Sequence, residues 1–256
     1  MLYSKFISAG LLSVVASATV VPRGLFAKDS LVRRDIVDTI ISEDEHWAEA
    51  NIANYGPEFF TSHLAGQNPD LLYIGCSDSR VPSDVFMNAT LGEVFTHRNI
   101  ANSIVLGDPN TMSVIDYALV HLNVSTIAIT GHTGCGGVKA SMDPEELEKS
   151  IKTFIKPITR LYQKNKSYID ALPTDAERQS FLVQLNVMRL VRLASNLKTV
   201  TERWEKGLPL VIHGLVYRME NGTLHDLNVT VSSKGQFDEL YYPPLKAQGL
   251  EFCACS

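Results

Sequence analysis

The stretch DLLYIGCSDSR, residues 70 to 80, is the segment from which the fold can be inferred most directly. Its first seven residues are mostly apolar, which predicts a short buried strand. The apolar run ends on Cys76, and Ser, Asp, Ser and Arg follow at once. One strand end therefore carries a soft metal ligand in Cys76, an acid in Asp78 and a fork-shaped cation in Arg80.

Short apolar segments alternate with segments of helical periodicity along the rest of the chain. Strands are predicted at 93–102, at 125–132 and in both arms of a hairpin over 208–231. Helices are predicted for 111–123, from about Gly136 onward, and for most of 143–206, with breaks at Pro157 and Pro173. This alternation favours an α/β fold with a mainly parallel central β-sheet flanked by helices and a C-terminal β-hairpin.

The segment before the first strand has a helical pattern of its own. Apolar residues recur at helical spacing between residues 35 and 66, and Gly56-Pro57 interrupts them. We expect one or two amphipathic helices here, forming an N-terminal helical arm.

A second polar cluster follows the strand at 125–132. GHTGCGG, residues 131 to 137, places His132 and Cys135 three residues apart in a glycine-rich loop, and glycine permits the backbone angles that turn both toward one point. With Cys76 they form a Cys2His set, which suits zinc and leaves one tetrahedral position open. A fourth ligand could come from Asp78.

Simpler interpretations apply to each residue taken alone. A lone histidine is more often a satisfied core or loop residue than a ligand, and a cysteine at a strand end is more often a small buried hydrophobe. A phosphate-binding loop is excluded because the Lys-Ser/Thr pair that should end it is absent. Taken together, Cys76, His132 and Cys135 favour metal binding.

Three segments, CSDSRVP, HRNIAN and GHTGCGGV, resemble the signature motifs of the β-class carbonic anhydrases, in the family's order and near its spacing. VIHGLVYRMENGTLHDL is similar to the family's closing hairpin, so the resemblance covers roughly residues 35 to 235. It implies a zinc lyase with one zinc per chain, which hydrates CO2 reversibly to bicarbonate and a proton by attack of zinc-bound hydroxide on CO2.

The resemblance also implies a role for individual residues. Cys76, His132 and Cys135 match the zinc ligands, and Asp78 and Arg80 match the catalytic dyad, in which the arginine holds the aspartate by charge-assisted hydrogen bonds. No further cofactor is implied. Family members assemble as homodimers or larger, with the site at the dimer interface and the N-terminal helix against the partner chain.

Composition excludes two other classes of partner. The net charge is −5 and no Lys/Arg block stands out, so nucleic acid is not expected as a partner. No apolar stretch after residue 30 is long enough to span a bilayer, so we expect no membrane span in the mature protein.

The chain divides into three parts by pattern. Residues 1–34 are predicted to be a cleavable leader, residues 35–240 the carbonic anhydrase domain, and residues 241–256 a C-terminal tail carrying Cys253 and Cys255. The ending Cys-Ala-Cys-Ser matches a prenylation signature only loosely, because its middle positions are not aliphatic.

The leader favours secretion. It has Lys5, a weakly apolar run, a small-x-small cleavage pattern at Ala16-Ser17-Ala18 and a possible dibasic processing point at Arg33-Arg34. Five Asn-x-Ser/Thr sequons agree with this, at Asn88, Asn123, Asn165, Asn221 and Asn228. The alternative is a mitochondrial transit peptide, because no acid precedes Asp29.

Two other functions are compatible with the same ligands. A hydrolase of CS2 or carbonyl sulfide would differ only in its access channel. A non-catalytic zinc-binding or redox-sensing protein would not need Asp78 and Arg80, and the presence of both argues against it.

Overall fold

A computed structural model of the chain describes residues 36–251. They belong to two compact units, divided between Leu64 and Ala65. The predicted leader and the cysteines at 253 and 255 lie outside the described residues.

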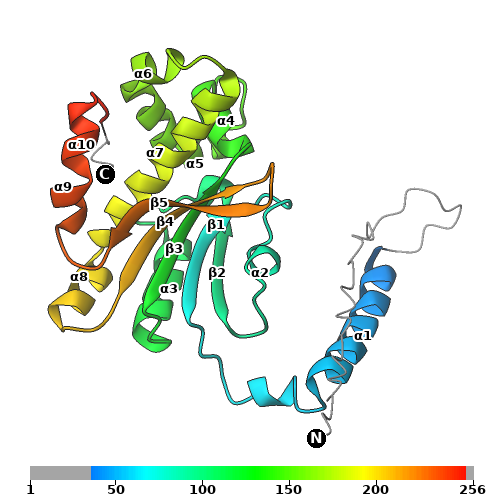
Figure 1. The fold of residues 1–256 in the computed structure, drawn as a ribbon. Helices are drawn as coiled ribbons and strands as arrows, with labels where there is room; N and C mark the ends of the chain where they lie inside the picture. Colours follow the sequence, from blue (N-terminus) through cyan, green and yellow to red (C-terminus); the bar gives the residue numbers. More distant parts are fainter. Residues whose placement is uncertain (1–35, 252–256) are drawn as a thin grey trace, which may run out of the picture. The chain divides into compact units, whose positions relative to one another are not determined.

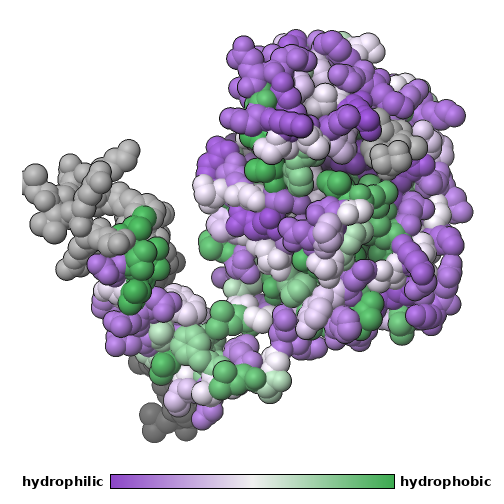
Figure 2. Space-filling model, turned by 180° about the vertical axis from the view of Figure 1, so that it is seen from behind, coloured by the Kyte–Doolittle hydropathy of each residue, from purple (hydrophilic) through white to green (hydrophobic). Residues whose placement is uncertain are grey.

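The first unit contains the helix α1 (Ile36–Tyr55) and the short 3-10 helix η1 (Thr61–His63). No residue of α1 is buried, although the helix carries large apolar side chains such as Ile40, Ile41 and Trp47. Figure 2 shows hydrophobic residues, in green, on the surface of this unit. The helix ends where the sequence predicts, before Gly56, whose φ of 97° the α-helix cannot accommodate.

The second unit is built on a five-stranded sheet in the order β2-β1-β3-β4-β5 (Figure 1). The strands are β1 (Leu71–Cys76), β2 (Val94–Asn99), β3 (Thr126–His132), β4 (Val211–Arg218) and β5 (Thr223–Val231). β1 to β4 are mutually parallel, and β5 is antiparallel to β4. This confirms the predicted mainly parallel α/β sheet with a closing hairpin.

Helices connect and cover these strands. They are α2 (Ser83–Phe86), α3 (Pro109–Asp116), α4 (Gly136–Met142), α5 (Lys149–Lys164), α6 (Lys166–Asp170), α7 (Asp175–Ser195), α8 (Lys198–Glu205), α9 (Gln236–Leu240) and α10 (Tyr242–Ala247), with the 3-10 turn η2 (Ile100–Asn102) and the π-helix η3 (Tyr117–His121). In the described residues no helix is both long and apolar enough to cross a membrane.

Burial explains the pattern of each strand. All residues of β1 and β3 except the first are buried, as expected for parallel strands with both faces covered. β4 instead alternates between buried and half-buried residues, which is typical of a strand with one more accessible face.

Helix α7 packs closely against β3 and β4. Its start is fixed by a capping box, in which Thr174 and Glu177 satisfy each other's backbone N–H groups. Gly131 of β3 permits the approach, since a Cβ there would lie 2.8 Å from Val183 Cγ1 and 2.9 Å from Val187 Cγ2. The glycine next to His132 is therefore required by packing as well as by the loop.

Two details of the predicted elements are wrong. Pro157 lies inside α5 and does not break it, because the helix buries Ile155 and Ile158 in the core. That burial offsets the cost of the missing N–H, about 3 kcal/mol. β2 ends at Asn99 and not at residue 102, since Ala101 adopts a left-handed conformation with φ 57°.

The replacement Gly131→Ala tests the contact between α7 and β3. The added methyl group overlaps both valines, so we expect a loss of about 1–3 kcal/mol in the free energy of unfolding. The measurement is urea denaturation. Gly136→Ala is the matched control, because a Cβ at Gly136 meets nothing within 4 Å. Equal stability of the two variants would contradict the close approach.

Candidate metal centre

Cys76, His132 and Cys135 meet at the carboxyl ends of β1 and β3. Their ligand atoms all lie within 4.8 Å of one another. The three residues are buried, and the two sulfurs are 3.9 Å apart. Adjacent parallel strands end at the same edge of a sheet, so two strand ends and the loop after β3 bring the three ligands together.

His132 is oriented as a ligand. Its Nδ1 lies 3.0 Å from the carbonyl oxygen of Thr133, which can only accept, so Nδ1 carries the proton. Its Nε2 is buried and has no hydrogen-bond partner among the described residues. The free lone pair on Nε2 is therefore available to a metal ion, and the carbonyl fixes the ring in this tautomer.

The two thiols cannot both ionise without a cation. The hydrogen bond from Cys135 lowers the pKa of Cys76 to about 4. The same interaction, together with burial, raises the pKa of Cys135 far above its usual range. A divalent metal removes this conflict by neutralising both sulfurs. With one imidazole and two thiolates in contact distance, the residues present fit zinc.

Backbone groups support the sulfurs. The N–H groups of Asp78 and Ala101 stabilise the thiolate of Cys76. The N–H groups of Val138 and Gly137, at the start of α4, do the same for Cys135.

Asp78 and Arg80 form the expected pair beside the cluster. Arg80 Nη2 donates to Asp78 Oδ2 at 2.7 Å, and Arg80 Nε donates to Oδ1 at 2.9 Å. These bonds hold the pKa of the Asp78 carboxyl well below its usual range. Asp78 Oδ2 lies 3.9 Å from His132 Nε2, so an ionised carboxylate stands next to the ligand cluster.

Arg98 holds the backbone of the loop that carries Cys76 and Asp78. Its Nε donates to the carbonyl of Cys76 at 2.7 Å, and its Nη2 donates to the carbonyl of Asp78 at 2.6 Å. Arg80 also donates to the carbonyl of Gly134 at 3.3 Å, which ties this loop to the one that carries Cys135.

Sequence reasoning missed two residues of α7 that reach this region. Gln179 donates to the carbonyl of Cys135 at 2.7 Å, and Asn186 donates to the carbonyl of Ala101 at 3.3 Å. Their spacing of seven residues puts both amides on one side of the helix, which was the available signal. Nothing local in the sequence links that side to the metal loops.

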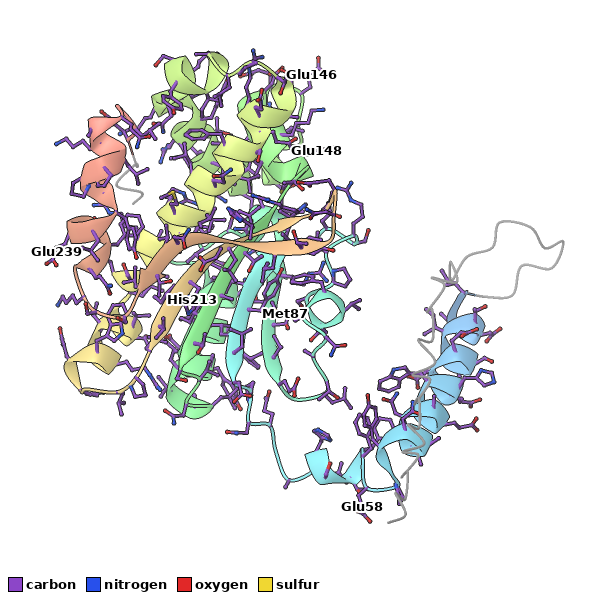
Figure 3. All side chains as sticks on the ribbon, viewed as in Figure 1. Glu58, Met87, Glu146, Glu148, His213 and Glu239 are labelled. Atoms are coloured by element: carbon purple, nitrogen blue, oxygen red, sulfur yellow. The ribbon has the colours of Figure 1, made fainter. Side chains whose placement is uncertain are left out.

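A histidine outside the cluster has a different role. His213 lies on β4 (Figure 3). It is paired with Ala128 of β3, which lies four residues before the end of that strand. Its Nδ1 lies 3.1 Å from Thr230 Oγ1, so it bridges β4 and β5. His213 is therefore a packing residue of the hairpin.

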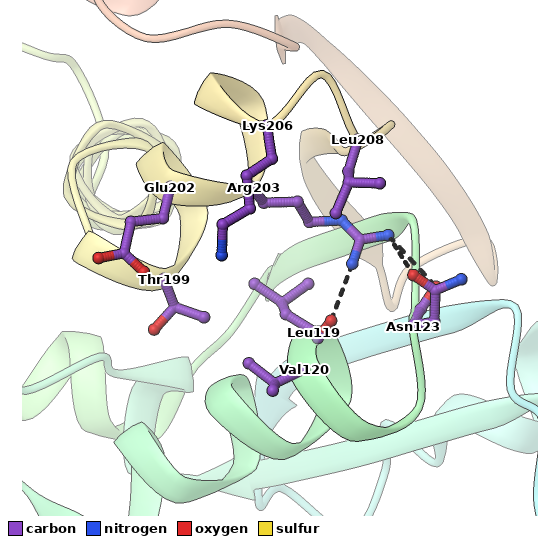
Figure 4. Close-up of a pocket in the computed structure, with 8 residues that line it drawn as sticks. All are labelled: Leu119, Val120, Asn123, Thr199, Glu202, Arg203, Lys206 and Leu208. Atoms are coloured by element: carbon purple, nitrogen blue, oxygen red, sulfur yellow. Dashed lines mark hydrogen bonds between the residues drawn. The ribbon is translucent and has the colours of Figure 1, made fainter.

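A separate hollow of about 220 Å³ lies between η3 and α8 (Figure 4). Arg203 forms part of its wall and is buried, but its guanidinium donates to the carbonyls of Leu119 and Pro209 and to Asn123 Oδ1. None of the three metal-ligand candidates lines this hollow. Arg203 therefore joins η3 to the segment before β4 and is a structural residue.

Comparisons with known proteins agree with this geometry. The family model described as carbonic anhydrase matches residues 71–224. A carbonic anhydrase of Emericella nidulans is 42% identical over 193 residues, which cover 75% of this chain and 83% of that protein.

Solved structures are also similar. One of two tetrameric β-carbonic anhydrases from Sordaria macrospora has a TM-score of 0.74 at 32% identity, covering 77% of this chain and all of that one. The β-carbonic anhydrase CafA of Aspergillus fumigatus has a TM-score of 0.71 at 33% identity, covering 76% of this chain and 91% of that one.

Proposed function

This chain belongs to the β-class carbonic anhydrases, which hydrate CO2 reversibly to bicarbonate and a proton, and we propose that Asp78 and Arg80 are its catalytic dyad. The observation that carries the proposal is the position of the Asp78 carboxylate, 3.9 Å from the Nε2 atom that faces the ligand cluster. Cys76, His132 and Cys135 hold the zinc.

Zinc bound by these ligands lowers the pKa of its water ligand and so supplies hydroxide near neutral pH. The contribution of Asp78 is orientation. An ionised carboxylate can only accept hydrogen bonds, so Asp78 would accept one from the attacking oxygen and orient it toward CO2. The position of that acceptor is what the surrounding residues must fix.

Arg80 supplies this constraint. Its two side-chain bonds to Asp78 are bidentate, and its own backbone N–H adds a third at 3.0 Å. Because the carboxylate is engaged in this way, it is held back from the metal. Without Arg80, the Asp78 carboxylate would be free to turn toward the ligand cluster.

The dyad is tested by stopped-flow CO2 hydration between pH 6.5 and 9, with zinc measured on the same samples. Asp78→Asn keeps the shape but replaces one acceptor oxygen by a donor, and we expect kcat/KM to fall by about 100-fold. Arg80→Ala should lose about 10-fold through misplacement of the carboxylate. The pKa of Asp78 rises when Arg80 is absent, but only toward about 4, so the acid stays ionised and the loss persists at pH 7.

The control is Asp143→Asn, because Asp143 is an exposed acid in the segment after α4. Wild-type rates in Asp78→Asn with full zinc would remove Asp78 from the mechanism. Wild-type protein with one zinc per chain and no hydration at any pH would redirect the search to CS2 and carbonyl sulfide.

For assembly we propose at least a homodimer, with the metal site at the dimer interface and α1 docked on a second copy. The support is the apolar surface of α1, where Ile40 is 48% exposed and Trp47 is 47% exposed. Surfaces of this kind mark interaction sites. The similar Sordaria macrospora enzymes are tetramers, so a dimer of dimers is the larger form compatible with the proposal.

Sedimentation velocity tests the assembly. The double variant Ile40→Glu/Trp47→Glu should shift the protein toward monomer, because two charges cannot be buried unpaired at the interface. Glu49→Lys, an exposed change on the same helix, should leave the sedimentation coefficient unchanged. A wild-type monomer, or a double variant that assembles normally, would refute the role of α1.

For the compartment we propose secretion, with residues 1–34 removed. Four sequon asparagines, Asn88, Asn123, Asn221 and Asn228, are exposed and so open to a glycan. Asn165 is buried and its amide donates to the carbonyls of Leu161 and Glu251, which makes this sequon unsuitable in the folded chain.

Fractionation of cells that express the full chain tests the proposal. We expect the protein in the medium, with a mobility on electrophoresis that increases after peptide N-glycosidase treatment. Replacement of all four exposed asparagines, Asn88, Asn123, Asn221 and Asn228, by Gln should abolish that shift. Recovery of the unglycosylated protein in mitochondria would favour the transit-peptide alternative.

A further inference from the structure

One side of α7 contacts two of the segments that carry a metal ligand and the turn η2, which faces the third ligand. Gln179 reaches the loop of Cys135, and Val183 and Val187 pack on Gly131, next to His132. Asn186 reaches Ala101, whose N–H group faces the sulfur of Cys76. The helix therefore touches the segments of His132 and Cys135 directly, and the turn η2 beside Cys76, through contacts at i, i+4, i+7 and i+8.

Ala101 is the unusual residue in this arrangement. It is fully buried and has φ 57° and ψ 37°, a left-handed conformation that side chains with a Cβ rarely adopt. Three interactions hold it there: its N–H faces Cys76, and its carbonyl accepts from Asn186 Nδ2 at 3.3 Å and from Ser103 Oγ at 3.5 Å. Asn186 thus favours the conformation that presents the N–H group to the sulfur.

The amide of Asn186 is itself oriented. Arg189, one turn further along α7, donates to Asn186 Oδ1 from Nη2 at 2.9 Å and from Nε at 3.3 Å. Both residues are buried. Since Arg189 occupies the oxygen, the amide nitrogen must face the carbonyl of Ala101, and a flipped amide would place two donors against each other.

Gln179 acts on the other thiol segment. Its Nε2 donates to the carbonyl of Cys135 at 2.7 Å, immediately before α4 begins. The two loops also touch directly, because a Cβ at Gly137 would lie 2.7 Å from Ile100 Cγ2 and 3.1 Å from Ala101 Cβ. A displacement of either loop would therefore be transmitted to the other.

We propose that Gln179 and Asn186 are positioning residues for the metal: Gln179 holds the backbone of Cys135, and Asn186 holds Ala101, whose N–H group faces the sulfur of Cys76. The inference rests on the proposed zinc ligands. The N–H groups directed at the sulfurs withdraw electron density from them, which keeps the metal electropositive. Gln179 and Asn186 therefore affect both how long the metal is retained and how strongly the thiolates donate to it.

The test compares Gln179→Glu with Gln184→Glu in the full-length protein. Gln184 is also half-buried on α7, and the same change there alters charge and shape equally. At position 179 the carboxylate faces a carbonyl that it cannot donate to. We expect zinc transfer to a chromogenic chelator to be about 10-fold faster for Gln179→Glu, and unchanged for Gln184→Glu.

A second readout separates positioning from general loosening of the fold. In cobalt-substituted protein, the thiolate-to-cobalt charge-transfer band in the near ultraviolet should shift for Gln179→Glu and for Asn186→Leu, but not for Gln184→Glu. Thermal unfolding of all three is recorded alongside. A fold defect would lower the melting temperature while leaving the band of the folded fraction in place.

Wild-type zinc release and an unshifted band in Gln179→Glu would overturn the proposal for that residue, even where Asn186→Leu fails to fold. Equal effects of Gln179→Glu and Gln184→Glu would overturn it as well. Wild-type protein that holds no zinc would overturn both this inference and the proposed ligand set, whereas inactive protein with tightly held zinc would count only against the proposed dyad.

Discussion

Two cysteine sulfurs lie buried 3.9 Å apart at the edge of the sheet, and this arrangement sets the main constraint on the molecule. Both cannot carry charge unless a cation is near, so the pKa of Cys76 falls while that of Cys135 rises. An imidazole nitrogen that has no hydrogen-bond partner among residues 36–251 completes the set. The two sulfurs and the imidazole nitrogen are thus arranged to bind a divalent metal. The remaining features of the site keep these three atoms in place or leave one side of the cluster open.

The ligands stand on the most rigid part of the fold. β1 and β3 are neighbouring central strands, buried almost throughout, and α7 packs on β3 at a glycine. Ten residues of α7 are buried, so its position is well determined by the core. Gln179 and Asn186 then link this helix to the loop of Cys135 and to the turn at Ala101. Neither of these segments has the regular backbone hydrogen bonds of a strand to fix its conformation.

The catalytic side of the site is more open. Arg80 is 59% exposed at its side chain, whereas Asp78 is 16% exposed and lies between the arginine and the ligands. Arg98 holds the backbone of the same loop through two carbonyls. Two arginines therefore fix Asp78, Arg80 through its carboxylate and Arg98 through its main chain.

The sequence by itself determined the ligand types, the acid–arginine pair and the order of strands and helices. These depend on local chemistry, since a thiol, an imidazole or an apolar run has the same preferences wherever the chain takes it. The resemblance of three motifs added the reaction.

Tertiary packing decided the backbone conformation at Pro157 and at Ala101. Burial of α5 outweighs the tendency of Pro157 to break a helix, and the surroundings of Cys76 outweigh the preference of Ala101 against a left-handed conformation. The roles of Gln179, Asn186 and Arg203 also emerged only in the folded chain. Each donates to a carbonyl 44, 85 or 84 residues away, and a carbonyl is present at every position, so no residue type in the sequence marks the partner.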